Sequence, residues 1–121
     1  MSFYYVATPY TKYPGGTEEA FREAARQTGR LLKAGVMAFS PIVATHAVAQ
    51  YGGIPHEIDN PLWLRLDEAL MRVSAGLIVV MMDGWEQSVG VAHEIDFFER
   101  VGKPIVYMMP GRVPEALLEP A

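Results

Sequence analysis

Residues 76–82 read GLIVVMM, and residues 83–90, which follow them, read DGWEQSVG. The first segment has no charged or polar side chain, which is typical of a short strand covered by helices on both faces. The second contains turn-forming residues and a serine that can begin a helix. Together they predict a buried strand, a loop and a helix start, the connection found in parallel sheets.

Three other short apolar segments have the same character, namely Phe3–Thr8, Val36–Ser40 and Pro104–Met109. Helical patterns separate the four segments. This alternation favours a single α/β domain over residues 1–121, with a mostly parallel sheet of four to five strands between layers of helices. Residues 110–121 contain three prolines and are expected to form an irregular tail.

The first helix is predicted from Thr17 to about Lys33. Thr17 can cap it, Glu18 and Glu19 suit its first turn, and Gly35 can close it. Its periodicity predicts a buried stripe made of Phe21, Ala24, Ala25, Thr28, Leu31 and Leu32.

Three further helices are expected over residues 40–51, 60–73 and 88–101. The first two open with a Ser-Pro or Asn-Pro pair, which is an N-cap followed by a proline in the first turn. Glycine follows the first and the third and can end them. The segment Ile54–Asp59 is expected to be an exposed loop.

Composition excludes several classes of protein. The chain has 121 residues, a net charge of −4 and no cysteine, so disulfides, thiolate metal sites and cysteine nucleophiles are absent. Binding to a nucleic acid polymer is not expected from an acidic chain, and no apolar run approaches the roughly 20 residues of a membrane helix. The first residues lack a basic segment, so a cytoplasmic protein is expected. A domain of this size has little room for a deep pocket of its own.

Two loops after predicted strands carry groups that can bind a ligand, because parallel sheets bind ligands at the carboxyl ends of their strands. The loop Thr8–Thr11 follows the first strand, and Asp83–Gly90 follows the third. In the second loop, free helix amides, the Ser88 hydroxyl and Gly90 can form an anion site suited to phosphate. Simple capping of the helix by Ser88 is the alternative, and it stays open.

Glu94 is an acid on the predicted inner face of the last helix. A carboxylate among apolar side chains is costly unless it is paired or faces a polar cavity, and such groups are enriched at functional sites. A glutamate tied to a backbone amide or an arginine is the structural alternative. The predicted inner arc holds Val91, Ile95, Phe97, Phe98 and Val101, and the predicted solvated face holds His93, Asp96, Glu99 and Arg100.

Asp67 is a second acid with apolar neighbours. Two carboxylates in unlike environments can divide the work of glycoside chemistry, one attacking the anomeric carbon and the other protonating the leaving group. An aspartate hydrogen-bonded to Ser74 or to a loop amide is the structural alternative. On its helix Asp67 lies beside Trp63, Met71 and Ser74, opposite the charged residues Arg65, Glu68 and Arg72.

Metal and cofactor sites are not predicted. His46, His56 and His93 lack the spacing of a metal motif. The chain also lacks a Walker loop, a GxGxxG motif after the first strand and the GxSxG turn of serine hydrolases.

These residues resemble the nucleoside 2-deoxyribosyltransferase superfamily, including the 2'-deoxynucleoside 5'-phosphate N-hydrolases. The resemblance rests on YYVATPY at residues 4–10, on Asp67, and on GWEQSVG at residues 84–90 followed by Glu94. It implies a flavodoxin-like fold and an enzyme of a nucleoside or nucleoside 5'-monophosphate, without a cofactor. It also implies a homo-oligomer, a dimer or tetramer, in which a neighbouring subunit helps to close each site. The apolar segment Val106–Met109, with the tail that follows it, is a candidate contributor to that contact.

By position, the resemblance gives Glu94 the role of a nucleophile that forms a glycosyl-enzyme intermediate. Asp67 would contact the nucleobase or help to protonate it, and Tyr5 would position the sugar and the glutamate. Ser88 stands where the monophosphate hydrolases have a phosphate-binding serine.

The loop after the first strand departs from the resemblance. It reads Thr8-Pro9-Tyr10 in place of a glycine-serine loop, and Pro9 has no amide donor. Tyr10 and Trp85 offer surfaces on which a base or sugar can stack, with packing at a loop edge as the alternative.

The sequence therefore predicts an enzyme that acts on N-glycosidic bonds, either a hydrolase or a deoxyribosyltransferase, with Glu94 as its central residue. A non-catalytic nucleotide-binding or sensor module is the competing class. A structural oligomer subunit is a third, favoured only if a salt bridge holds Glu94.

Overall fold

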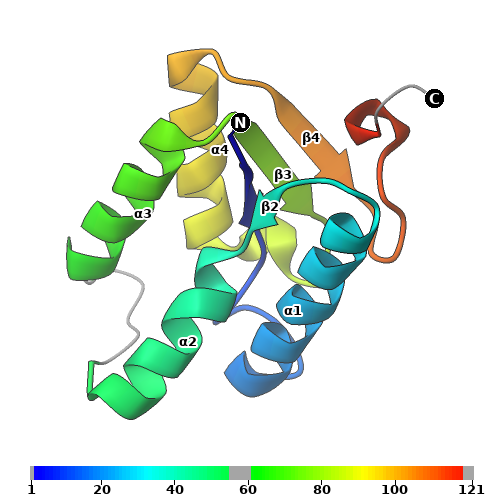
Figure 1. Ribbon diagram of the computed structural model, residues 1–121. Coiled ribbons are helices and arrows are strands. Elements are labelled where there is room, and N and C mark those ends of the chain that lie inside the picture. Colours follow the sequence, from blue (N-terminus) through cyan, green and yellow to red (C-terminus); the bar gives the residue numbers. More distant parts are fainter. Residues whose placement is uncertain (1, 55–60, 119–121) are drawn as a thin grey trace.

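A computed structural model describes residues 2–54 and 61–118 of the chain. Its strands form one parallel sheet in the order β2-β1-β3-β4 (Figure 1). They are β1 (Tyr4–Ala7), β2 (Ala38–Phe39), β3 (Gly76–Val80) and β4 (Ile105–Met108). The four predicted strands are confirmed, each shorter than predicted. The shortest, β2, lies at the edge of the sheet and pairs with β1 only.

The helices lie on both faces of this sheet, in a flavodoxin-like three-layer sandwich (Figure 1). They are α1 (Thr17–Lys33), α2 (Pro41–Gly52), α3 (Pro61–Val73) and α4 (Val89–Val101), with short 3-10 turns η1 (Trp85–Gln87) and η2 (Glu115–Leu117). No described helix is long and apolar enough to cross a membrane.

The core consists of two layers because side chains alternate along a strand. On one face, strand residues pack against α3 and α4, in a cluster that includes Tyr5, Leu77, Val79, Met71 and Phe98. On the other face they pack against α1, in a cluster that includes Val6, Ile78, Val80, Leu31 and Met108. All five residues of β3 are buried, as the apolar run predicted.

Helix α1 differs from the prediction at two positions. Gly16 occupies the N-cap with a φ of 89°, so Thr17 is the first helical residue and not the cap. Leu32, predicted to be buried, is 47% exposed. Gln27 is buried instead, because its amide accepts a hydrogen bond from the Gly111 amide (2.8 Å) and donates one to Glu23 (2.8 Å).

The segment after β4 is not a loose tail in its described part. Val113 and Leu117 pack on the α1 side of the core, and the Gly111 amide is bound by Gln27. Apart from η2, the described part of this segment has no regular secondary structure, and its apolar side chains nevertheless pack on the core.

The starts and stops of α2 and α4 are confirmed. The Ser40 hydroxyl accepts a hydrogen bond from the Val43 amide at 3.2 Å, and Gly53 follows α2 with a φ of 73°. Ser88 caps α4, and Gly102 ends it with the same left-handed conformation. The predicted cap Asn60 and the loop residues after Ile54 lie outside the described residues.

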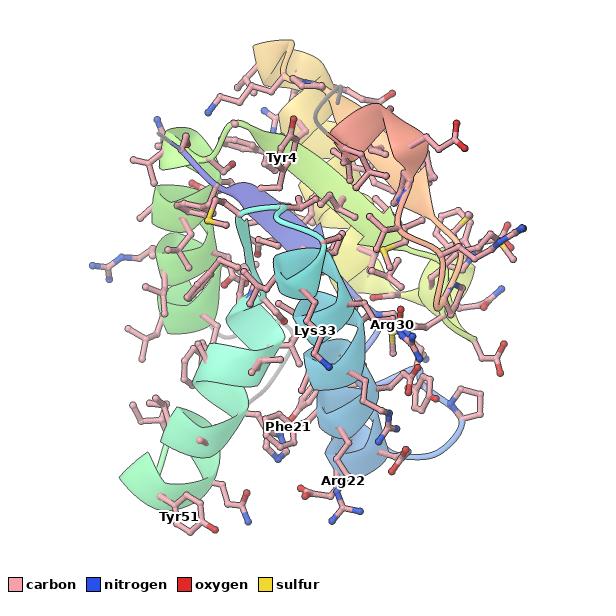
Figure 2. All side chains as sticks on the ribbon, turned by 45° about the vertical axis from the view of Figure 1, so that its right-hand side comes forward. Tyr4, Phe21, Arg22, Arg30, Lys33 and Tyr51 are labelled. Carbon is pink, nitrogen blue, oxygen red and sulfur yellow. The ribbon has the colours of Figure 1, made fainter. Side chains whose placement is uncertain are left out.

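The outer face of α4 is exposed at most of the predicted positions. On α4, Asp96, Glu99 and Arg100 are exposed as predicted, but Val101 is 49% exposed and His93 is only partly exposed. Figure 2 shows Phe21 of α1 beside α2, and Tyr51 near the end of α2, where it is 84% exposed.

Gly84 joins the loop after β3 to the loop after β1. Its φ is +88°, and a Cβ atom at this position would collide with the backbone carbonyl of Lys12. The two loops therefore approach each other closely only because residue 84 has no side chain.

We expect Gly84→Ala to destabilise the protein more than Gly102→Ala. Gly102 has a similar φ of +73° but open space around it, so its substitution should cost only about 1 kcal/mol for the left-handed conformation. Gly84→Ala should add roughly 1–3 kcal/mol for the collision. Urea denaturation of both variants measures the difference, and equal losses would contradict a close contact between the loops.

Candidate functional site

A pocket lies at the carboxyl ends of β1 and β3. The chain runs from β1 outward to β2 and then crosses back to β3 on the other side of β1, which makes this edge the point where parallel sheets bind ligands. Of the predicted site residues, the pocket brings together Tyr5, Thr8, Tyr10, Asp67, Ser88, Gly90 and Glu94.

Glu94 lies in α4 and opens into this pocket, where it keeps partial exposure. Burial raises the pKa of Glu94 to about 8, an effect that interaction with the Tyr5 hydroxyl reduces and the charge of Asp67 increases. No ion pair to Glu94 occurs within the described residues. The salt bridge that would have favoured a purely structural role is therefore not found in this part of the chain.

Asp67 reaches the pocket from α3. Burial raises its pKa to about 6. Trp63, Met71 and Ser74 around it are buried, as the helix pattern predicted. The Ser74 hydroxyl donates to the Met71 carbonyl at 2.8 Å, so the predicted alternative of an Asp67–Ser74 hydrogen bond is not supported.

Tyr5 lies on β1 between the two acids and the core, with its side chain fully buried. Burial, followed by the charges of Glu94 and Asp67, raises its pKa well above the usual value. The phenol interacts with the Glu94 carboxyl, but more loosely than a standard hydrogen bond, since its hydroxyl has no such partner in the described residues. Tyr5 thus keeps its proton and can donate a hydrogen bond to an ionised Glu94.

Thr8 supplies a second unsatisfied hydroxyl. The residue is 4% exposed, it lines the pocket, and its Oγ1 has no hydrogen-bond partner in the residues described. Buried polar groups are normally paired, so unsatisfied hydroxyls on Thr8 and Tyr5 beside one pocket indicate a polar ligand.

Ser88 both caps α4 and borders the pocket. Its hydroxyl accepts a hydrogen bond from the Val91 amide at 3.2 Å, which confirms the capping interpretation. Gly90, also at the pocket, lies in the first helical turn. First-turn amides have no partner inside a helix, and the helix dipole favours negative charge there. The geometry is compatible with an anion, and whether one binds stays a prediction.

Trp85 does not line the pocket. It lies in η1, partly buried against the α4 side of the core, and its indole contacts Tyr107 of β4 with ring centroids 5.9 Å apart. This placement matches the packing alternative and gives no support to a stacking role in ligand binding.

Sequence reasoning missed pocket residues that come from the crossover between β2 and β3. Pro41, Ile42 and Thr45 at the start of α2, and Trp63 and Leu64 of α3, complete the walls. The Ser40-Pro41 helix start after a strand was the available signal, because it places this end of α2 at the ligand-binding edge. Within the described residues no group of His, Asp and Glu could hold a metal ion.

The pocket encloses about 80 Å³. Pockets for drug-sized ligands have roughly 300–1,000 Å³. Only part of a ligand of that size fits inside, and the remainder would lie against residues at the mouth.

Glu94→Gln is expected to stabilise the protein increasingly as pH rises. When the pKa of an acid is higher in the folded than in the unfolded state, its contribution to stability is fully present below the unfolded pKa. Above that pH the unfolded state ionises first, so the free energy of unfolding falls as pH rises, until the folded pKa is passed. Between the Asp67 pKa of about 6 and the Glu94 pKa of about 8, the advantage of the variant over wild type should grow by on the order of 1 kcal/mol per pH unit. Urea denaturation at several pH values measures it.

Asp96→Asn is the matched control, because Asp96 lies on the same helix, is 63% exposed and pairs with Arg100 at 2.9 Å. The effect of Asp96→Asn on the free energy of unfolding should show no comparable trend with pH. A pH-independent effect of Glu94→Gln would contradict the burial of an uncompensated carboxyl.

Comparison with known proteins places the chain in a family without naming an activity. A search of curated proteins found no match. A family model described as Domain of unknown function (DUF1937) matches residues 2–110, a span that includes all four strands and every residue of the pocket. The chain therefore belongs to the family described as Domain of unknown function (DUF1937).

Proposed function

We propose that the protein cleaves the N-glycosidic bond of a nucleoside or nucleoside 5'-monophosphate, with a preference for 2'-deoxy sugars. The observation that carries the proposal is the pair Glu94 and Asp67, two carboxyl groups with different raised pKa values in one pocket. Pairs of acids whose environments separate their pKa values are the usual sign of divided acid and nucleophile roles. The resemblance to the nucleoside 2-deoxyribosyltransferase superfamily supports the same assignment.

In the proposed reaction an oxygen of ionised Glu94 bonds to C1' while the bond from C1' to the base breaks. The electron pair of that bond goes to the base nitrogen, and Asp67 supplies a proton to it. In a hydrolase, water then attacks C1', gives a proton to the now ionised Asp67, and the bond from C1' to Glu94 breaks. In a transferase, a nitrogen of a second base attacks C1' in the same way.

The electrostatics of the pocket suit the positive charge that develops at C1'. No basic side chain forms an ion pair with Glu94 or Asp67 among the described residues, so two uncompensated acids face the reacting sugar. Charges act strongly where water is excluded. The ligand-free pair keeps its proton mainly on Glu94, which has the higher pKa, so the proposed reaction requires this proton to pass from Glu94 to Asp67.

The Ser88–Gly90 end of α4 favours a 5'-monophosphate over a free nucleoside. It offers first-turn amides and a positive helix end at the same pocket. Tyr5 supports the ionised form of Glu94 by donating to it, which is why its interaction lowers the pKa of that acid.

We further propose that a second copy of the chain covers the pocket in a dimer or tetramer. The pocket is small, and α3, which carries Asp67, exposes apolar residues along one face. Leu66, Ala69 and Val73 recur at helical spacing, and Leu66 and Val73 are 42% and 64% exposed. The segment Val106–Met109 is also a candidate for this contact. Tyr107 and Met109 are exposed and can contribute to it, whereas Met108 is fully buried.

Leu66→Lys is expected to dissociate this oligomer. Light scattering coupled to size exclusion should give a multiple of 13.4 kDa for wild type and the monomer mass for the variant, because a buried unpaired lysine opposes association. Tyr51→Lys, at a highly exposed site on α2, is the control and should leave the mass unchanged. A monomeric wild type would refute the oligomer.

Glu94→Ala is expected to abolish release of free base. Purified protein is incubated with nucleosides and with ribo- and deoxyribonucleoside monophosphates, and the base is detected by chromatography. Loss of a nucleophile lowers kcat on the order of 10³-fold or more. Glu99→Ala, on the exposed face of the same helix, should keep the wild-type rate.

Unchanged release in Glu94→Ala would refute the mechanism. If wild type binds these nucleotides in calorimetry but releases no base from any of them, the protein is a nucleotide-binding module instead. Faster cleavage of monophosphates than of nucleosides would support the anion site at α4, and the reverse would contradict it.

A further inference from the structure

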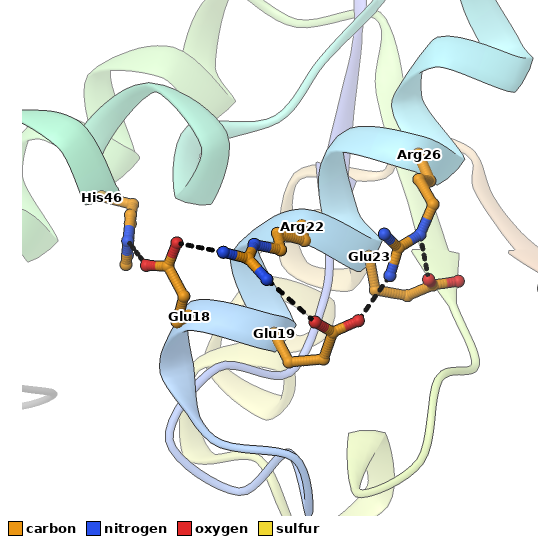
Figure 3. A network of polar contacts seen from close by, with 6 residues as sticks. All are labelled: Glu18, Glu19, Arg22, Glu23, Arg26 and His46. Carbon is orange, nitrogen blue, oxygen red and sulfur yellow. Dashed lines mark hydrogen bonds and ion pairs between the residues drawn. The ribbon is translucent and has the colours of Figure 1, made fainter.

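A second polar cluster lies against the wall of the pocket. The Tyr10 hydroxyl is 2.7 Å from Nδ1 of His46, and Nε2 of His46 is 2.9 Å from Oε2 of Glu18. The three residues come from the loop after β1, from α2 and from the first turn of α1. Figure 3 shows Glu18 between His46 and Arg22, with which it also pairs at 3.5 Å.

The chemistry of the cluster fixes where its protons lie when the imidazole is neutral. A carboxylate can only accept, so Nε2 of His46 carries the hydrogen that points to Glu18. Nδ1 is then the acceptor, and the Tyr10 hydroxyl donates to it. Burial and the charge of Glu18 raise the pKa of Tyr10, against a hydrogen bond from Thr17 that lowers it, so the phenol keeps this proton at neutral pH.

The imidazole at the centre of the cluster is rigidly held. The Phe21 ring stacks on it with centroids 4.3 Å apart and an angle of 14° between the planes. The His46 side chain is only 9% exposed. The rings of His46 and Tyr10 lie nearly perpendicular to each other, with centroids 5.8 Å apart, so His46 contacts both the hydroxyl and the ring of Tyr10.

Tyr10 separates two hollows of the surface. On one side it lines the pocket that contains Glu94 and Asp67. On the other it lines a shallow groove of about 340 Å³, together with Glu18, His46 and residues of α2. The orientation of Tyr10 therefore determines how large the pocket is at this wall.

We propose that His46 and Glu18 are positioning residues that hold Tyr10 as the wall of the nucleotide pocket, and that Tyr10 thereby determines which nucleobases or sugars fit. This inference rests on the proposed function. A purely structural role, in which the cluster only joins α1 to α2, makes a different prediction, since it affects stability without affecting ligand choice.

Tyr10→Phe tests the tether, because it removes the hydroxyl and keeps the ring. For the monophosphate that wild type cleaves fastest, KM should rise about 3- to 10-fold, the effect of one hydrogen bond. The value of kcat should stay within about twofold, and the ratio of kcat/KM between purine and pyrimidine monophosphates should move toward one. Tyr13→Phe, which changes a loop tyrosine outside the pocket, is the control.

Two substitutions of His46 separate positioning from packing. His46→Leu removes the acceptor for Tyr10 and should reproduce the effects of Tyr10→Phe. His46→Asn places an amide oxygen near the position of Nδ1 and should restore KM and selectivity toward wild type, although the stack on Phe21 is lost. If the two variants are equally impaired, or if kcat falls while KM is unchanged, the proposal is wrong.

A measurement without ligand keeps this inference separate from the proposed function. In protein with ¹⁵N-labelled histidine, long-range NMR spectra at neutral pH should show His46 with its proton on Nε2, and a proton on Nδ1 would overturn the arrangement. If wild type releases no base, the proposed enzyme activity fails, and dissociation constants of the same nucleotides replace KM. If no nucleotide binds at all, both proposals fail.

Discussion

The parallel pairing of β1 with β3 determines where every group of the pocket lies. Tyr4 pairs with Gly76 and Ala7 with Val79, so the chain leaves both strands at the same edge of the sheet. The register depends on a close approach at its start. A side chain at Gly76 would place a Cβ atom 2.8 Å from the carbonyl oxygen of Pro104 and 3.0 Å from the Tyr4 ring. At the other end, the absence of a side chain at Gly84 allows the two loops to lie close together at Lys12.

The pocket formed at this edge is acidic because Glu94 and Asp67 line it and no Lys, Arg or His among the described residues does. Arg22 and Arg26 pair with glutamates along the surface of α1. Lys103 donates to the carbonyls of Arg72 and Ser74, both at 2.7 Å, and so satisfies the end of α3. Glu94 and Asp67 have no ion-pair partner among the described residues, and this is the electrostatic basis of the proposed chemistry.

Features that depend on neighbours along the chain could be predicted from the sequence. The caps at Ser40 and Ser88, the glycine stops, the buried β3 and the inward direction of Glu94 follow from spacing within one element. Local pattern succeeds there because the same few residues determine both the conformation and the face that is buried.

Features that join distant segments could not be predicted in this way. Gln27 is buried because a residue 84 positions away binds its amide, and Tyr10 meets His46 across 36 positions. The sequence allows His46 to be compared only with metal-ligand motifs, because Tyr10 and Glu18 become its neighbours only through the fold. For Trp85 the sequence leaves stacking on a ligand and packing at a loop edge both open, and its contact with Tyr107 matches the packing alternative.

The buried acids also bring the stability of the protein into conflict with the function proposed for its pocket. Each carboxyl that the pocket holds in ionised form makes the native state less favourable, so the chain gives up stability in order to keep Glu94 and Asp67 where they are. A library of variants selected only for heat resistance at alkaline pH should therefore accumulate neutral replacements at these positions. The residues that such a selection removes first would mark the functional centre without any knowledge of the substrate.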